Sequence, residues 1–418
     1  MDNAVPTPVP ALALRAKASA SAVAAASTEV KNAALAASAE QLLRDTQEIL
    51  DANRIDVEGA RASGTPEKMI DRLHLDDARL LAMADGLREV ADLPDPVGTI
   101  TAEWKRPNGL MMQKVRVPLG VVGIIYENRP NVTSDAFGLC LKSGNVAFLR
   151  GSSAGLSSNL AITHTIRKAL RESGLPEDAL ILVDDARREA AVEFMRQSGL
   201  VDCLIPRGGK ALVDSILEHA TVPYVIDGDG NCHVYVDATA NLEMATEIIV
   251  NAKMQRPTVC NAAESLVVHN SVARDFLPMA ASALKDVELV GDERAHQILP
   301  NIGEAVAEDW FAEYLDLKLS IRVVDDLDEA IEHVNETGSG HSEAIITEDP
   351  AAATRFANEV DAAAVLINAS TRFVDGGEFG FGAEIGISTQ KLHARGPMGL
   401  EQLTTEKYII HGSGQVRR

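Results

Sequence analysis

The sequence contains little cysteine and no long apolar run. It has four cysteines in 418 residues, and no two of them form a C-x-x-C pair. Such sparse, irregular spacing in a long chain predicts reduced thiols and no zinc site. No apolar stretch is long enough to span a bilayer, and Asp2 stands where a secretory signal would be basic. We therefore expect a cytoplasmic protein that binds no membrane and no metal.

Positive charge is also scarce. Lys and Arg number 39 against 61 Asp and Glu, which gives a formal net charge of -22. So acidic a balance disfavours binding to nucleic acid, but it leaves room for a local basic pocket that holds a phosphorylated substrate. The 46% hydrophobic content supplies material for two or three domains with their own cores.

A dinucleotide-binding G-x-G-x-x-G motif is absent, because the closest string, residues 380–386, has the wrong spacing and follows no strand. Two other glycine loops follow predicted strands, where open α/β sheets bind ligands. Each places an arginine and free backbone N–H groups at a helix start, which suits phosphate. The loops comprise Arg150, Gly151, Ser152 and Ser153, and then Pro206, Arg207, Gly208 and Gly209. A nucleotide site and two ordinary turns with solvated arginines both fit this pattern.

The chain falls into three kinds of sequence. Before residue 100, apolar residues at helical spacing predict two long helices, 27–53 and 66–90. An Asn-Gly turn within the alternating stretch 100–119 predicts a β-hairpin. From there on, apolar strands alternate with helices in two blocks, which predicts two doubly wound parallel sheets. The strands expected in the first block are 121–126, 146–150, 179–183, 203–205 and 224–226, and the helices are 134–142, 156–173, 188–198 and 210–219.

One cysteine lies on a predicted turn between a helix and a strand. The helix expected over residues 242–254 ends before Pro257, because the residue preceding a proline avoids the helical region. A thiol at Cys260 can then act as a nucleophile, with its own N–H free for a developing oxyanion. The competing interpretation is a small buried hydrophobe, as most free cysteines are.

The remaining thiols and two histidines are weaker candidates for chemistry. Cys140 and Cys203 fall in core patterns. Cys232 and His233 are adjacent, but no partner stands at metal-ligand spacing. His341 is expected in a loop, with either a functional role or a simple hydrogen bond.

Six motifs spread over nearly the whole chain after residue 100. They are GVVGIIYENRP (120–130), IPRGG (205–209), CHVYVD (232–237), GHSE (340–343), EIGISTQK (384–391) and RGPMGL (395–400). Together with the late cysteine they resemble the aldehyde dehydrogenase superfamily, and within it most closely the γ-glutamyl phosphate reductase family. The resemblance implies an aldehyde dehydrogenase-like α/β fold, with two doubly wound parallel-sheet domains and a small β-hairpin oligomerisation element.

The resemblance also gives the domains their roles. Residues 1–99 and 120–229 would form an NADP-binding α/β domain with N-terminal helices, and residues 230–400 a catalytic domain that carries the cysteine. Residues 100–119 and 401–418 would form the oligomerisation element, which implies a homodimer or homotetramer. The implied reaction is the NADPH-dependent reduction of L-glutamyl 5-phosphate to L-glutamate 5-semialdehyde and phosphate, in L-proline biosynthesis. The substrate would come from glutamate 5-kinase.

Family roles can be carried onto three residues of this sequence, and a fourth, Arg256, is a candidate from its position four residues before the thiol. Cys260 would be the nucleophile that forms a thioester, and Asn128 would supply an amide to the oxyanion hole. Arg150 falls where NAD-preferring relatives carry a lysine, so its guanidinium is expected to bind the 2′-phosphate of NADP. Arg256 is a candidate for holding the phosphate or the α-carboxylate, against the alternative of an arginine that caps helix carbonyls.

One departure from the superfamily favours phosphate-dependent chemistry. Hydrolytic members carry a glutamate that activates water, and Ile226 stands at or near that position here, with Asp227 a weaker candidate base. An enzyme that reduces a thioester should not hydrolyse it. Two other functions stay open: a dehydrogenase of the same superfamily with another acyl donor, such as an acyl-CoA, and a catalytically silent nucleotide-binding relative. The presence of Cys260 together with Asn128 argues against the silent relative.

Overall fold

The computed structural model describes residues 6–226 and 228–417. The chain divides into two compact units. Unit 1 comprises Met1–Ile226, Phe381–Ile385 and Met398–Arg418, and unit 2 comprises Asp227–Gly380 and Gly386–Pro397. The domain boundaries and roles expected from the sequence stay predictions.

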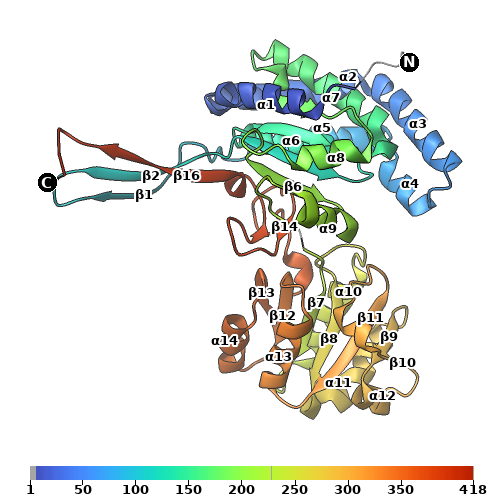
Figure 1. Cartoon of the computed structure of the whole chain (residues 1–418). Coiled ribbons are helices and arrows are strands. Elements are labelled where there is room, and N and C mark those ends of the chain that lie inside the picture. The colour runs from blue at the N-terminus through green and yellow to red at the C-terminus, as the bar shows by residue number, and fades with distance from the viewer. Residues whose placement is uncertain (1–5, 227, 418) are drawn as a thin grey trace. The chain divides into compact units, whose positions relative to one another are not determined.

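Helices open unit 1, as Figure 1 shows in blue: α1 (Val9–Ala24), α2 (Thr28–Arg44), α3 (Thr46–Ala62), α4 (Glu67–Leu73) and α5 (Asp77–Asp92). The prediction of two long helices here is wrong, because each is divided. Asp45 separates α2 from α3, and its carboxylate accepts a hydrogen bond from Lys168 at 2.9 Å. Asp76 starts α5 by accepting the Arg79 N–H at 2.7 Å. Both breaks leave the apolar periodicity unchanged, so the periodicity alone did not reveal them.

A four-stranded parallel sheet in the order β5-β4-β3-β6 forms the centre of unit 1. Its strands are β3 (Val121–Tyr126), β4 (Val146–Arg150), β5 (Leu180–Leu182) and β6 (Cys203–Arg207), and the helices are α6 (Val132–Lys142), α7 (Leu156–Glu172), α8 (Arg188–Met195) and α9 (Lys210–His219). All of β3 is buried, as a strand covered on both faces should be.

Two expected elements of this sheet differ from the structure. The strand predicted at 224–226 is wrong, because only Tyr224 forms an isolated bridge, to Leu204. The preceding Pro223 has no N–H to donate to a ladder. The helix predicted over 188–198 ends early, and Gly199, with φ of 79°, belongs to the turn that follows it.

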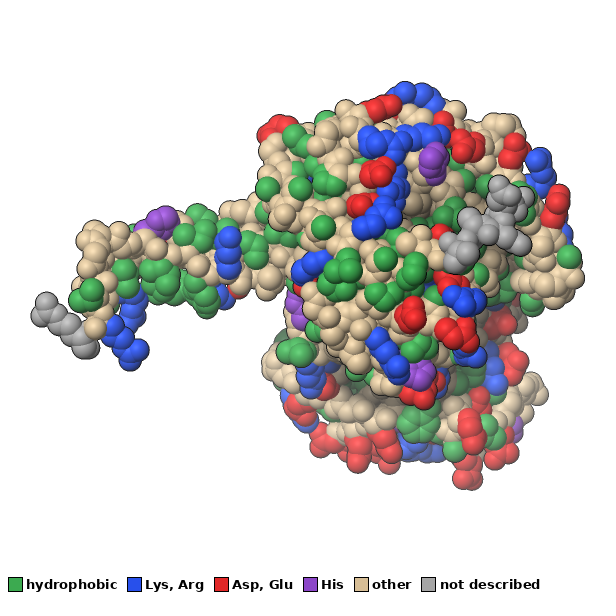
Figure 2. Space-filling model, turned by 45° about the horizontal axis from the view of Figure 1, so that its top comes forward, with side chains coloured by type: hydrophobic (Ala, Val, Ile, Leu, Met, Phe, Trp, Pro, Cys, Tyr) green, Lys and Arg blue, Asp and Glu red, His purple; other side chains and the backbone are tan. Residues whose placement is uncertain are grey.

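A small antiparallel sheet in the order β1-β2-β16 completes unit 1, with β1 (Ile100–Lys105), β2 (Met111–Pro118) and β16 (Thr404–His411). The hairpin predicted for residues 100–119 is thereby confirmed, and Gly109 of its turn adopts φ of 89°. Trp104, Met112 and Ile410 lie opposite one another across the three strands. Hydrophobic side chains gather along this sheet (Figure 2), and Ile410 is 54% exposed. The oligomeric state stays a prediction.

Unit 2 is built on a seven-stranded parallel sheet in the order β10-β9-β11-β8-β7-β12-β13. Its strands are β7 (Cys232–Val236), β8 (Ala263–His269), β9 (Glu288–Gly291), β10 (Gly303–Glu304), β11 (Lys318–Val324), β12 (Ser342–Ile346) and β13 (Ala364–Ile367). Its helices are α10 (Leu242–Met254), α11 (Asn270–Ala283), α12 (Glu293–Ile298), α13 (Leu327–Thr337) and α14 (Pro350–Glu359), and β14 (Ile387–Ser388) pairs with β15 (Gly396–Pro397).

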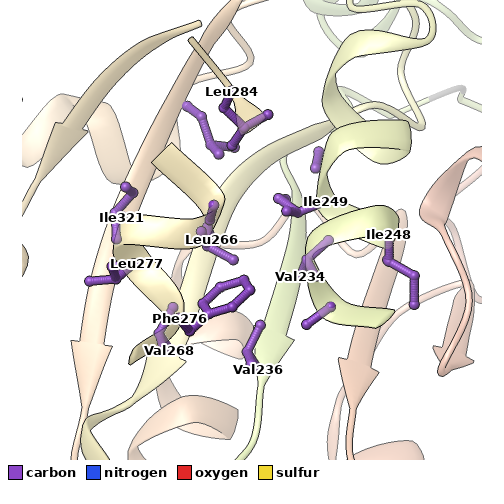
Figure 3. Packing of buried hydrophobic residues seen from close by; sticks show 14 of the residues in the cluster. Val234, Val236, Ile248, Ile249, Leu266, Val268, Phe276, Leu277, Leu284 and Ile321 are labelled. Carbon is purple, nitrogen blue, oxygen red and sulfur yellow. The ribbon is translucent and has the colours of Figure 1, made fainter. Parts of the chain in front are cut away.

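Alternate residues of the central strands serve two cores. Val234 of β7 and Leu266 of β8 face α10 and α11, where they pack with Phe276 (Figure 3). The neighbouring residues Tyr235 and Val267 belong to a second core on the other face of the sheet. Helices therefore cover both faces, and the predicted fold class of two doubly wound parallel sheets with a small β-hairpin element is confirmed. No helix of the described residues has the length and apolar character needed to cross a membrane.

Candidate active site

Cys260 lies on the turn between α10 and β8 in unit 2. Gln255 caps α10, with its N–H donating to the Asn251 carbonyl, and the chain then turns at Pro257. The Ala262 N–H donates to the Val259 carbonyl at 3.0 Å, which closes a tight turn around the cysteine. Of the four thiols, that of Cys260 is the one that is not fully buried.

A buried ion pair ties together the two elements that flank this turn. Lys253, near the end of α10, places its Nζ 2.5 Å from the Oε2 of Glu264 on β8, and both side chains are fully buried. Burial raises the pKa of Glu264 to about 7 and lowers the pKa of Lys253. The second oxygen of Glu264 accepts the Leu315 N–H at 3.2 Å. Removal of either partner would leave the other buried without compensation, so the pair fixes how α10 meets β8.

The backbone of Cys260 packs against the start of β7. The Cys232 thiol donates a hydrogen bond to the Cys260 carbonyl at 3.2 Å. Burial raises the pKa of Cys232 well above its usual value, so this thiol keeps the proton that it donates. A Cβ on Gly230 would lie 1.7 Å from the same carbonyl oxygen, so glycine is required there.

His341 lies behind Cys232, with its Nδ1 3.8 Å from the Cys232 sulfur and 2.7 Å from the Ser342 hydroxyl. His341 lies in the loop before β12, as predicted, and its side chain is fully buried. Burial lowers its pKa to about 4, so the imidazole is neutral at pH 7. Its Nε2 has no hydrogen-bond partner among the described residues.

A short 3₁₀ helix, η4 (Thr371–Phe373), holds the other side of the turn. The Thr371 hydroxyl donates to the Asn261 carbonyl at 2.7 Å, and the Asn261 amide donates to the Val374 carbonyl at 2.9 Å. Between these two bonds stands Arg372, whose Nε donates to the Gln255 Oε1 at 2.8 Å. Burial lowers the pKa of Arg372, and the charge of Arg256 lowers it further.

Arg256 is exposed beside the nucleophile. In the described part of the chain, its side chain donates to no carbonyl of α10, so it does not act there as a helix cap. The proximity of Arg256 to Cys260 along the chain predicted this residue. No local pattern links the cysteine to Arg372, to Cys232 as a hydrogen-bond donor, or to the ion pair between Lys253 and Glu264, so these were not predicted.

In unit 1, the first predicted loop lies at the carboxyl end of β4. Arg150 is the last residue of that strand, and the loop after it contains Ser152. The Ser152 hydroxyl donates to the Asn128 Oδ1 at 2.7 Å, which orients the amide with its NH2 group free to donate. Asn128 follows β3, the neighbouring strand. The structure thus brings Asn128 together with the loop predicted to bind a nucleotide.

The guanidinium of Arg150 reaches along this edge of the sheet. Its Nη2 lies 3.4 Å from the Ala186 carbonyl and 3.3 Å from the Arg187 carbonyl. Its Nε is buried and has no hydrogen-bond partner in the described part of the chain. Burial lowers the pKa of this arginine, while the nearby Asp185 raises it. An N–H without a partner at the carboxyl end of a parallel strand fits an anionic ligand.

The second predicted loop is shorter than expected, because Pro206 and Arg207 are the last residues of β6. Arg207 lies close enough to Asp135 of α6 to lower the pKa of that carboxyl, which burial raises to about 6. A Cβ on Gly208 would lie 2.7 Å from the Glu127 carboxyl carbon, and Gly209 precedes α9. Tight packing against Glu127 therefore accounts for one of the two glycines.

Several other candidates have no visible part in a site. Cys140 and Cys203 are buried, as predicted. His233 is buried, with its Nδ1 3.0 Å from the Glu343 Oε2. Among the described residues, no group of three or more His, Cys, Asp or Glu side chains is arranged to hold a metal. Ile226 is buried, and Asp227 lies outside the described residues.

Comparison with known proteins gives consistent matches over the whole chain. The model of the aldehyde dehydrogenase family matches residues 9–316 and 319–409. A γ-glutamyl phosphate reductase from Thermoanaerobacter pseudethanolicus is 54% identical over 390 residues, which is 93% of this chain and 94% of the relative. The crystal structure of the γ-glutamyl phosphate reductase from Thermotoga maritima matches with a TM-score of 0.97 at 47% identity, covering 99% of this chain and 100% of that one.

A more distant structure shares the fold alone. It is an engineered glycolyl-CoA reductase with bound NADP+, with a TM-score of 0.67 and 17% identity over 97% of this chain and 98% of that one. The resemblance noted from the sequence and the aldehyde dehydrogenase-like fold are both confirmed by these matches.

Proposed function

The chain belongs to the aldehyde dehydrogenase family and, within it, to the γ-glutamyl phosphate reductases. It is therefore an oxidoreductase, and we propose that it reduces L-glutamyl 5-phosphate to L-glutamate 5-semialdehyde and phosphate, with NADPH as the reductant, as a step of L-proline biosynthesis. The single observation that carries the mechanism is the arrangement around Cys260. Cys260 is partly exposed, while the buried Cys232 and Thr371 hold its own carbonyl and that of Asn261.

In the proposed reaction, the Cys260 thiolate attacks the acyl carbon and forms a carbon–sulfur bond. The carbon–oxygen bond to phosphate breaks, and phosphate departs with the electron pair. The Cys260 N–H and the Asn128 amide are proposed to donate hydrogen bonds to the oxyanion that forms on the carbonyl oxygen. Collapse of the reduced thioester releases the aldehyde and restores the thiolate.

The nicotinamide cofactor is proposed to bind unit 1, where the carboxyl ends of β4 and β6 form the loops described above. When bound, NADPH supplies the hydride that reduces the thioester. Arg150, Gly151, Ser152 and Ser153 would bind the adenosine end, with Arg150 directed at the 2′-phosphate. The unpartnered Nε of Arg150 supports this assignment. Pro206, Arg207, Gly208 and Gly209 would border the same edge of the sheet.

The reaction requires that water does not cleave the thioester. Hydrolytic members of the superfamily use a glutamate at the position near Ile226, whose buried apolar side chain cannot activate water. In the reverse direction phosphate is then the group that releases the acyl chain. Phosphate dependence therefore separates this function from that of a relative with a CoA acyl donor.

The test is NADP reduction with glutamate semialdehyde at varied phosphate concentration, for the wild type and Cys260→Ala. We expect activity that requires phosphate, and a loss of at least about a thousandfold in kcat for the variant, because no other group can form the thioester. Wild-type activity without phosphate would contradict the proposal. Activity with CoA in place of phosphate would indicate the other acyl donor.

A further inference from the structure

Two arginines of unit 2 near Cys260 form no ion pair with a carboxylate of the described residues. The side chain of Arg372 makes one hydrogen bond among the described residues, from Nε to the neutral amide of Gln255. Arg256 follows Gln255 directly, and its side chain makes no hydrogen bond or ion pair in the described part of the chain. In a chain with a formal net charge of -22, two neighbouring arginines without an ion pair are unusual, although the charge of Asp375 also acts on Arg372. Their mutual repulsion costs energy until an anion lies between them.

The position of Arg372 is fixed, although that of Arg256 is freer. Thr371 and Val374, on either side of Arg372, are hydrogen-bonded to the backbone carbonyl and to the side-chain amide of Asn261, the residue next to the nucleophile. The Arg372 backbone N–H donates to the Ser370 hydroxyl, which closes the turn. The guanidinium is thus held on a rigid segment at the nucleophile. Binding sites on such segments lose little entropy when a ligand binds.

The groups that change the pKa of Arg372 show which charges lie near its guanidinium. Burial and the charge of Arg256 both lower the pKa of Arg372, whereas Asp375 raises it, as does Cys260 in its thiolate form. Arg372 therefore lies within electrostatic range of both Arg256 and the reacting sulfur. A guanidinium in that position also favours the thiolate form of Cys260.

We propose that Arg256 and Arg372 form a phosphate-binding site in unit 2, which holds the phosphoryl group of the acyl phosphate and, in the reverse reaction, inorganic phosphate. This inference rests on the proposed function. When the sulfur attacks and the carbon–oxygen bond breaks, negative charge grows on the departing phosphate, and two planar forks of N–H donors stabilise it.

The phosphoryl group fits this site better than the α-carboxylate of the substrate does. In glutamyl phosphate a single oxygen separates phosphorus from the attacked carbon, whereas three carbons separate that carbon from the α-carboxylate. Arg256 precedes Cys260 by four residues, and Arg372 lies within electrostatic range of both Arg256 and the Cys260 sulfur, so the pair is placed for the nearer anion. Phosphate also carries more charge than a carboxylate, which matches two guanidiniums rather than one.

The experiment measures the Michaelis constants for phosphate and for glutamate semialdehyde in the reverse reaction. For Arg372→Gln and for Arg256→Gln we expect the KM for phosphate to rise about tenfold or more, since each loses charge-assisted hydrogen bonds. The KM for the semialdehyde should change less than about twofold. Arg372→Lys keeps the charge without the fork, and it should give an intermediate KM for phosphate.

Arg274→Gln is the matched control, because Arg274 is an exposed arginine of unit 2 on α11, and its KM for phosphate should equal that of the wild type. A second readout needs no turnover: inorganic phosphate should slow the alkylation of Cys260 by iodoacetamide in the wild type but not in Arg372→Gln.

Two results would overturn the inference while leaving the proposed function intact. One is an unchanged KM for phosphate in both glutamine variants. The other is a rise in the KM for semialdehyde alone, which would assign the arginines to the α-carboxylate. Turnover of the wild type without phosphate would instead contradict the proposed function itself.

Discussion

At the scale of single residues, the environment of Cys260 is set by groups distant in sequence. Its carbonyl accepts the Cys232 thiol, and Gly230 leaves room for that carbonyl because it has no Cβ. A nucleophile must be held within a fraction of an ångström to attack efficiently, so contacts to its backbone matter as much as contacts to its sulfur. Cys232 is a positioning residue in this arrangement, since it acts through Cys260.

We expect Cys232→Ala to lower kcat about two- to tenfold, because the Cys260 carbonyl loses its donor. Cys232→Ser should recover part of the loss, since a hydroxyl can donate to the same carbonyl. The measurement is kcat and KM for both variants in the reverse reaction. The control is Cys140→Ala, which removes a buried thiol of unit 1 and should lower the melting temperature without changing kcat. Equal kcat in Cys232→Ala and wild type would contradict the positioning role.

The sequence could identify Cys260 but not its surroundings. A proline after a helix and a β-branched run after the cysteine are local signals, and they predicted the turn. Arg372 and Cys232 reach the same turn from other elements, which no spacing along the chain can reveal. Their roles follow from the tertiary structure, in which β7 contacts the carbonyl of residue 260 and η4 contacts the carbonyl of residue 261.

At the scale of elements, predictions succeeded where a segment alternated between apolar strand and helix. The bounds of β3, β4, α9 and α10 were predicted to the residue. The predictions failed where a helix is divided although its apolar periodicity continues, as at Asp45 and Asp76 in the N-terminal helices. β6 runs further than predicted, to Arg207. The predicted strand ended at residue 205 because Pro206 and Arg207 resemble the start of a loop in the sequence. Caps and strand ends depend on tertiary partners.

The loop at the end of β4 carries its own prediction. Arg150→Ala should lower kcat/KM for NADP about tenfold or more and leave that for NAD nearly unchanged, because only NADP carries the 2′-phosphate proposed to bind the guanidinium. The measurement is the ratio of kcat/KM for the two cofactors. Arg171→Ala, on α7, is the control and should keep the wild-type ratio. A preference that is unchanged in Arg150→Ala would contradict this assignment.

At the scale of the whole molecule, the sequence predicted the class of fold, but it did not predict the order of the strands or which segments belong to which unit. Two blocks of alternating strands and helices predicted two parallel sheets, and both are present. The order of strands in unit 2 runs β10-β9-β11-β8-β7-β12-β13, which periodicity cannot supply. Nor did it indicate that Phe381–Ile385 belongs to unit 1 while Gly386–Pro397 belongs to unit 2.

The central claim is that Cys260 carries the acyl group as a thioester that only phosphate releases. The most direct measurement is a rapid-quench experiment with glutamate semialdehyde and NADP in the absence of phosphate, followed by mass spectrometry of the peptide that contains Cys260. We predict a burst of about one NADPH per active site and a glutamyl group on Cys260, which phosphate then removes. Continuous NADPH formation without phosphate, or turnover with no adduct on Cys260, would contradict the account.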